Sequence, residues 1–294
     1  MKLKFMEYSR RQASPNPSPS GEGGSPRSGE TGGEPWTKRQ ALGEPAAPHP
    51  SPLRGDILPK RGGIGRLPCG SLLVGLNATP AALRCSGGLW LPDQRTLVVA
   101  DLHLEKGSSF ARRGVMLPPF DTRATLARLE AEVAELSPER VVLLGDTFHD
   151  RQAHGRLAFD DRLRVEALAR GRRLVWIVGN HDADGPGDLP GEVADELAVG
   201  TLILRHEPEP GRQPGEVSGH LHPCARVAGK ARSVRRRCFL TDGERLILPA
   251  FGAYAGGLNV LDRAYRGLFG EGVFAACLGD DKVRAIRPTS LLPD

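Results

Sequence analysis

The sequence predicts an α/β fold: a four-layer α/β/β/α sandwich built from two mixed sheets in one domain. Two observations favour it. Residues 96–178 contain three short apolar runs of strand length, separated by segments with helical periodicity. Residues 202–248 contain four strand-like runs with few helical segments between them. The second region therefore favours another, partly antiparallel sheet that packs on the first.

The first 66 residues differ from the rest in composition. They contain 10 Pro and 11 Gly, about a third of the segment, which exceeds the ~25–30% typical of low-complexity chain. They carry 11 Lys/Arg and 6 Asp/Glu, whereas residues 67–294 carry 29 of each, so the net charge of +5 belongs to this segment. We expect 1–66 to be a disordered tail, either an interaction segment or, as we prefer, translated sequence from a mis-assigned start. Residues 67–294 are expected to form the single domain.

The remaining composition indicates a cytoplasmic protein. The five cysteines are odd in number and far apart, without a C-x-x-C pair, which favours free thiols in a reducing compartment. No run approaches the ~18 apolar residues of a membrane helix, and the N-terminus lacks the apolar core of a signal peptide. We therefore expect no membrane association.

Individual elements follow from local patterns. Strands are expected at 71–76, 88–91 and 96–100, followed by a loop at 107–117. Asp121 is expected to be the N-cap of a helix with Leu126, Leu129, Val133 and Leu136 at helical spacing, and Ser137-Pro138 ends it. A strand at 141–144, a helix at 160–170 closed by Gly171, and a strand at 174–178 complete the alternation. Later strands are expected at 202–205, 216–220, 233–240 and 245–248.

Potential metal ligands follow the ends of these predicted strands. There are seven of them: Asp101, His103, Asp146, Asn180, His206, His220 and His222. Asp101 and His103, two residues apart, would face one side of an extended chain. Imidazole together with carboxylate oxygen suits Mn²⁺, Fe or Zn²⁺. The number of ligands favours two divalent cations about 3.5–4 Å apart, although each residue alone is as compatible with a structural role.

The order of these residues resembles the calcineurin-like metallophosphoesterase superfamily: D-x-H, G-D, G-N-H-D, a lone H, then G-H-x-H. The resemblance implies that one metal is held by Asp101, His103 and His222, the second by Asn180, His206 and His220, with Asp146 bridging. It also implies that His181 is the general acid and that Asp182 orients it. One departure is His149, which stands where many members of the superfamily have an acid.

A narrower resemblance covers about residues 70–285. The stretches L-H-L-E-K-G at 102–107 and R-R-R-C-F at 235–239 are similar to the bacterial ligase-associated DNA damage response endonucleases of the PdeM type. This resemblance implies phosphodiester cleavage in DNA repair, alongside an ATP-dependent DNA ligase and a helicase. It implies DNA as the partner and two divalent metal ions, foremost Mn²⁺, as cofactors.

The predicted mechanism is in-line attack on phosphorus by a hydroxide that bridges the two metals, with His181 protonating the leaving oxygen. Lys106, Arg235, Arg236 and Arg237 are the candidates for substrate or phosphate contacts, although the three arginines are equally compatible with a solvated strand face. Two other functions remain open. One is hydrolysis of a small substrate, such as a nucleotide-sugar pyrophosphate, a cyclic nucleotide or a phosphomonoester. The other is a non-catalytic repair scaffold, which the filled ligand positions disfavour.

Overall fold

The computed structural model describes residues 64–229 and 232–294, all within the second of the two units into which the chain divides, Pro48–Asp294. The predicted tail therefore lies outside the described residues up to residue 63. Its last three residues form a strand instead: β1 (Ile64–Arg66) pairs antiparallel with β2 (Leu72–Leu76). The Arg66 side chain also donates to the carbonyl of Val283 at 3.1 Å. Ile64–Arg66, which were assigned to the tail, thus form the edge of a sheet.

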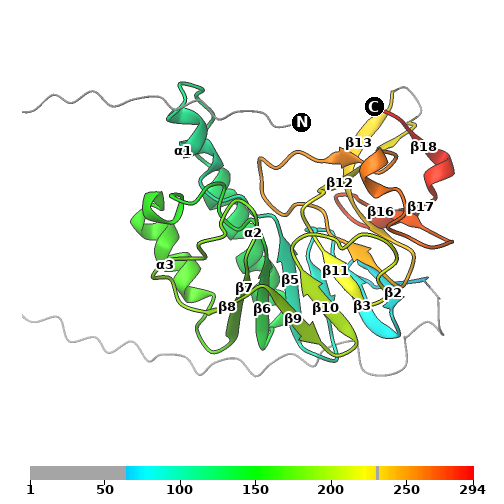
Figure 1. The fold of residues 1–294 in the computed structure, drawn as a ribbon, viewed down its shortest axis with the longest axis horizontal. Coiled ribbons are helices and arrows are strands. Elements are labelled where there is room, and N and C mark those ends of the chain that lie inside the picture. Colours follow the sequence, from blue (N-terminus) through cyan, green and yellow to red (C-terminus); the bar gives the residue numbers. More distant parts are fainter. Residues whose placement is uncertain (1–63, 230–231) are drawn as a thin grey trace, which may run out of the picture. The chain divides into compact units, whose positions relative to one another are not determined.

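The first sheet has eight strands in sequence order (Figure 1). After β1 and β2 come β3 (Thr79–Leu83), β4 (Leu89–Leu91), β5 (Thr96–Ala100), β6 (Arg140–Leu144), β7 (Arg173–Ile177) and β8 (Glu192–Ala194). The pairs up to β4–β5 are antiparallel, and β5 to β8 are parallel. Strand β3 was not predicted, since its turn from β2 uses Asn77 and Ala78 at φ 45° and 65° instead of glycine.

The second sheet is also mixed and has ten strands. They are β9 (Glu196–Val199), β10 (Leu202–Arg205), β11 (Glu216–Ser218), β12 (Pro223–Val227), β13 (Val234–Thr241), β14 (Leu246–Ile247), β15 (Leu258–Asn259), β16 (Phe274–Leu278), β17 (Val283–Ile286) and β18 (Leu291–Leu292). The four predicted strands of this region correspond to β10, β11, β13 and β14. Within the sheet β10, β11 and β14 are parallel neighbours, whereas most other pairs are antiparallel.

Three α-helices occur in the described residues: α1 (Lys106–Ala111), α2 (Asp121–Leu136) and α3 (Phe159–Ala167). Helix α1 lies where a loop was expected, and it shows no apolar periodicity. Asp121 is not the N-cap of α2, because Phe120 holds that position. Its carboxylate instead accepts the backbone N–H of Gly107 at 2.9 Å. The α1 turn is therefore fixed by a contact with the start of the next helix.

Three apolar clusters define the layers. One lies between the sheets and includes Val98 and Val142 opposite Leu204 and Phe239. The second lies between the first sheet and helices α2 and α3, which cover its other face (Figure 1). The third covers the outer face of the second sheet and contains Tyr265 of a short 3₁₀ turn, η2 (Arg263–Tyr265). The α/β fold with two mixed sheets is confirmed, although the fourth layer of the described residues holds this 3₁₀ turn and loops in place of an α-helix.

The topology brings the ends of five parallel strands to one edge. Strands β5, β6 and β7 are adjacent and parallel in the first sheet, and β10 and β11 are adjacent and parallel in the second. A bridge between Ala100, the last residue of β5, and Ala250 links the two regions. Loops that follow these strands therefore meet. No helix among the described residues is both long and apolar enough to cross a membrane.

Candidate metal centre

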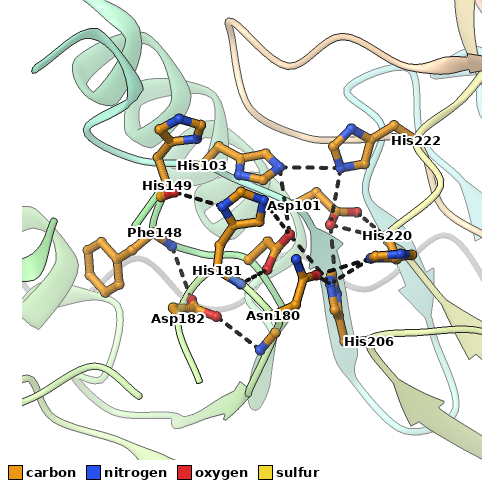
Figure 2. Close-up of polar contacts among 12 residues, drawn as sticks. Asp101, His103, Phe148, His149, Asn180, His181, Asp182, His206, His220 and His222 are labelled. Carbon is orange, nitrogen blue, oxygen red and sulfur yellow. Dashed lines mark hydrogen bonds and ion pairs between the residues drawn. The ribbon is translucent and has the colours of Figure 1, made fainter. Parts of the chain in front are cut away.

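All seven predicted ligands lie in loops that follow these strands, and their side chains converge. Figure 2 labels all of them except Asp146. Asp101 and His103 follow β5, Asp146 follows β6, and Asn180 follows β7. His206 follows β10, while His220 and His222 lie between β11 and β12. Residues separated by more than a hundred positions are thus brought to one place by strand order.

Five of the seven ligands have a left-handed backbone. Asp101, His103, Asp146, His220 and His222 have φ between 43° and 65°. The expectation that Asp101 and His103 share one face of an extended strand was therefore wrong, although their side chains do converge. A non-glycine residue in this region costs roughly 1–3 kcal/mol, and such residues cluster at functional sites. The side chains of these residues are therefore directed toward the centre by a loop conformation and not by strand geometry.

The first group of side chains consists of Asp101, His103 and His222. Its possible ligand atoms all lie within 4.8 Å of one another. The Nε2 atoms of His103 and His222 are 3.3 Å apart, and Asp101 Oδ1 is 3.3 Å from His222 Nε2. The Asp101 carboxylate is fully buried and also accepts the backbone N–H of His220 at 3.0 Å. These contacts fix the carboxylate in one orientation.

The second group consists of Asp146, His206 and His220, again within 4.8 Å of one another. Asn180 joins it, because its Oδ1 lies 3.1 Å from both His206 Nε2 and His220 Nδ1. Asp146 also connects the two groups. Its Oδ2 is 3.4 Å from His206 Nε2 in the second group and 4.0 Å from His103 Nε2 in the first.

The donor set fits divalent cations. The Nε2 atoms of His103 and His222, which face each other at 3.3 Å, can share at most one hydrogen bond. The buried carboxylates of Asp101 and Asp146 lie among the histidines. Burial, together with the charge of His222, lowers the pKa of His103 to about 3. Burial alone would raise the pKa of Asp146, but His206 outweighs it and holds that pKa at about 2. Neutral imidazole and ionised carboxylate are the forms that bind metal.

His181 lies beside this centre without belonging to either group. Its Nε2 is 3.9 Å from Asp146 Oδ2, and its backbone N–H donates to Asp146 Oδ1 at 2.9 Å. The other ring nitrogen, Nδ1, is 2.8 Å from the carbonyl oxygen of His149. Because a carbonyl can only accept, Nδ1 carries a proton. The side chain is 40% exposed, so Nε2 is accessible to a substrate.

Asp182 does not make the contact expected of it. Its buried carboxylate accepts the backbone N–H of Phe148 at 3.1 Å and that of Gly179 at 2.9 Å. It therefore ties the β6 loop to the β7 loop, while the His149 carbonyl orients His181. Burial raises the pKa of Asp182.

His149 was noted in the sequence only as a departure, yet its side chain forms part of the site wall. A third group of possible ligand atoms within 4.8 Å contains His103, His149 and His181. The His149 ring stacks on His181, with ring centroids 5.5 Å apart (Figure 2). The feature of the sequence that could have indicated a role for His149 is its position three residues after Asp146.

The glycine before each motif is required by close approach. A Cβ at Gly179 would lie 2.3 Å from the Asp146 carboxylate, and one at Gly219 would lie 2.4 Å from that of Asp101. Neither carboxylate can move without leaving its own hydrogen bonds. These glycines let the loops pack directly on the ligands.

The four residues that were predicted to contact a phosphate lie in different surroundings. Lys106 is half-buried at the start of α1. Arg237 donates to the carbonyl oxygens of Ala250 and Gly252, and Arg235 donates to that of Gly257 at 2.6 Å. Both arginines therefore support the 250–257 loop. Arg236 is exposed.

The fold and this cluster of buried histidines and carboxylates define a metal-dependent phosphoesterase. Residues 94–254, more than half of the chain, match the family model described as calcineurin-like phosphoesterase. The chain belongs to this family, as the superfamily resemblance predicted.

The solved structures that are similar to the chain include the following two. One is a nuclease, MPE, from Pseudomonas putida, with 30% sequence identity and a TM-score of 0.57, covering 74% of this chain and all of that one. The other is Yfce, a phosphoesterase from E. coli, with 16% identity and a TM-score of 0.33, covering 65% of this chain and 98% of that one. No curated protein matches the chain.

Proposed function

We propose that this phosphoesterase is a metal-dependent DNA endonuclease. The observation that carries the proposal is the meeting of two ligand groups at Asp146, which touches His103 of one and His206 of the other. Similarity to a Pseudomonas putida nuclease over 74% of the chain supports nucleic acid as the substrate. DNA repair as the context, with a ligase and a helicase as partners, remains a prediction from the resemblance.

In this proposal Asp101, His103 and His222 would hold one divalent cation and Asn180, His206 and His220 the other, and Asp146, which lies near both groups, would serve both. When bound, such cations supply an acidified water and neutralise charge on the phosphate. Carboxylate oxygen suits Mn²⁺ and imidazole suits Fe and Zn²⁺, so the mixed ligands are compatible with all three metals, of which we propose Mn²⁺ first.

The protein's own groups complete the reaction. His181 Nε2 is the exposed nitrogen beside the centre, and we assign it the proton that the leaving oxygen takes up. The His149 carbonyl holds the ring by accepting from Nδ1, so Nε2 stays directed toward the site. Asp182 supports this arrangement indirectly, because its carboxylate connects the two loops that carry His149 and His181.

Partial exposure favours a polymer over a small enclosed substrate. His181, His220 and His222 remain partly accessible at the rim of the centre. A strand could thus enter and leave on either side, which endonucleolytic cleavage requires. A non-catalytic scaffold has no need of a strained backbone at five of the seven ligand positions.

The test is a panel of substrates with metal-depleted protein to which Mn²⁺, Fe²⁺ or Zn²⁺ is returned. The substrates are circular single-stranded DNA, duplex DNA, bis-p-nitrophenyl phosphate and p-nitrophenyl phosphate. Because circular DNA has no ends, its linearisation identifies an endonuclease. Hydrolysis of the aryl monophosphate alone would refute the proposal and favour a phosphomonoesterase.

A further inference from the structure

A pocket of about 460 Å³ lies beside the metal centre on the α1 side. It is lined by Ser109, Arg112, Arg113, Asp150, Arg151 and Gln152, and we call it the arginine pocket. His149 connects it to the centre. The His149 ring stacks on His181 on one side and lies 5.9 Å from the ring of Phe110, in α1, on the other.

The arginine pocket carries an excess of positive charge. Its one acid, Asp150, is already paired with Arg156 through two hydrogen bonds of 2.7 and 2.8 Å. Within the part of the chain that the structure describes, Arg112 donates only to the neutral amide of Gln152, at 2.9 Å. The side chain of Arg113 makes no hydrogen bond or ion pair with residues 64–229 or 232–294.

Two further cations reinforce this charge. Arg151 is more than half exposed, and its one acidic neighbour, Asp184, is 3.6 Å away and equally exposed. Such a pair binds weakly in water. Lys106, half-buried at the start of α1, is a further cation on the α1 side of the centre. The positive region therefore extends from the pocket to the wall of the metal centre.

The opposite side of the centre has the opposite charge. A second pocket, of about 410 Å³, adjoins Asn180 and His206 and is lined by Asp195, Glu196, Glu207 and Glu209. Its one arginine, Arg205, is paired with Glu196 at 2.7 Å and with Glu209 at 3.1 Å. A backbone phosphate would be repelled there and attracted on the α1 side.

We propose that the arginine pocket binds an internal backbone phosphate of the DNA strand, next to the phosphodiester that is cleaved. The strand then leaves the centre over α1 and not over β10. The inference deepens the proposed function and rests on it. Arg112 and Arg113 are the principal contacts, and neutral Ser109 and Gln152 can donate to the same phosphate.

The test compares Arg112→Ala/Arg113→Ala with the wild-type protein on single-stranded DNA and on bis-p-nitrophenyl phosphate, which has no neighbouring phosphate. We expect the ratio of kcat/KM on DNA to that on the aryl diester to fall on the order of tenfold, mainly through KM. The slope of log(kcat/KM) against log[salt] should become shallower by about 0.7 for each lost phosphate contact. Arg112→Lys/Arg113→Lys should restore much of the kcat/KM ratio and of the salt slope.

A matched control removes two arginines from the other edge of the sheet. Arg95 and Arg173 lie before β5 and at the start of β7, and both are exposed. Arg95→Ala/Arg173→Ala changes the net charge equally and should preserve the ratio and the salt slope. If the control lowers the ratio of kcat/KM values as much as Arg112→Ala/Arg113→Ala does, the overall charge of the protein, and not the pocket, causes the effect.

Four other outcomes would overturn the inference. Equal loss on DNA and on the aryl diester would indicate a structural role for the arginines, and loss only with oligonucleotides bearing a terminal phosphate would indicate a pocket for strand ends. If the wild-type protein hydrolyses the aryl diester but neither cleaves nor binds DNA, the proposed function is refuted. The proposal that the arginine pocket binds a DNA phosphate is then refuted as well. If it cleaves DNA and the variant matches it, the pocket alone is refuted.

Discussion

His149 and His181 are stacked, and the backbone carbonyl of His149 accepts the Nδ1 proton of His181 at 2.8 Å. One residue therefore fixes both the plane and the tautomer of the other. With Nδ1 engaged, the nitrogen available to a substrate is Nε2, which faces the centre near Asp146. The contact with Nδ1 uses the backbone of His149 and would remain with any side chain there, whereas the stacking requires the His149 ring.

Replacing His181 with alanine should reduce turnover while leaving the metals in place. His181 belongs to neither ligand group that includes Asp101 or Asp146, so metal content by mass spectrometry should stay at the wild-type value. Loss of a general acid typically costs 10²–10⁴-fold. We expect that loss on DNA, whose alkoxide leaves poorly, and a much smaller one on bis-p-nitrophenyl phosphate. Equal losses on both substrates would exclude the acid role.

Replacing Asp146 with asparagine should remove the metal pair. Asp146 Oδ2 is the carboxylate oxygen near both His206 and His103, and the amide lacks the charge that offsets two cations. The measurement is the number of bound ions per chain after gel filtration, together with the rate. Asp150→Asn is the control, since that carboxylate pairs with Arg156 instead. Full metal content and rate in Asp146→Asn would show that the ligand assignment is wrong.

The strands that carry the site could be predicted because they are buried on both faces. Val98 of β5 packs between the sheets while Val99 packs under the helices, so the whole run is apolar. A polar residue directly after such a run stands out in the sequence. This is why Asp101, Asp146 and Asn180 could be identified without coordinates.

The features that could not be predicted depend on contacts between distant residues. Helix α1 is held by the bond from Gly107 to Asp121, and nothing in its own six residues indicates a helix. The left-handed backbone at Asp101 and His103 is likewise imposed by the loops around them. A motif gives the identity of a ligand but not the backbone conformation that aims it.

Replacing Asp182 with asparagine distinguishes the predicted orienting role from the observed one. The carboxylate accepts backbone N–H groups of Phe148 and Gly179, so the amide should weaken the loop connection by roughly 1–3 kcal/mol. We expect a lower melting temperature and weaker metal binding, with the ratio of rates on poor and good leaving groups kept. A loss confined to poor leaving groups, as in His181→Ala, would instead mean that Asp182 acts through the His181 ring.

The Asp150–Arg156 pair should make stability depend on pH in acid. The hydrogen bonds from Arg156 hold the pKa of Asp150 below its usual value of 3.8. A carboxyl group whose pKa is lower in the folded state stabilises the protein above its unfolded pKa, and that contribution disappears as the pH falls through the folded pKa. Arg156→Gln should therefore cost about 1 kcal/mol near neutral pH, and the difference from wild type should shrink below about pH 4. Urea denaturation at several pH values measures this difference.

A pH-independent part of the difference will remain, because Arg156 also donates to Ser108 Oγ at 3.0 Å. Arg162→Gln, which breaks a more exposed pair with Asp188, is the control. A difference between wild type and Arg156→Gln that stays constant down to about pH 2 would show that the ion pair does not stabilise the fold.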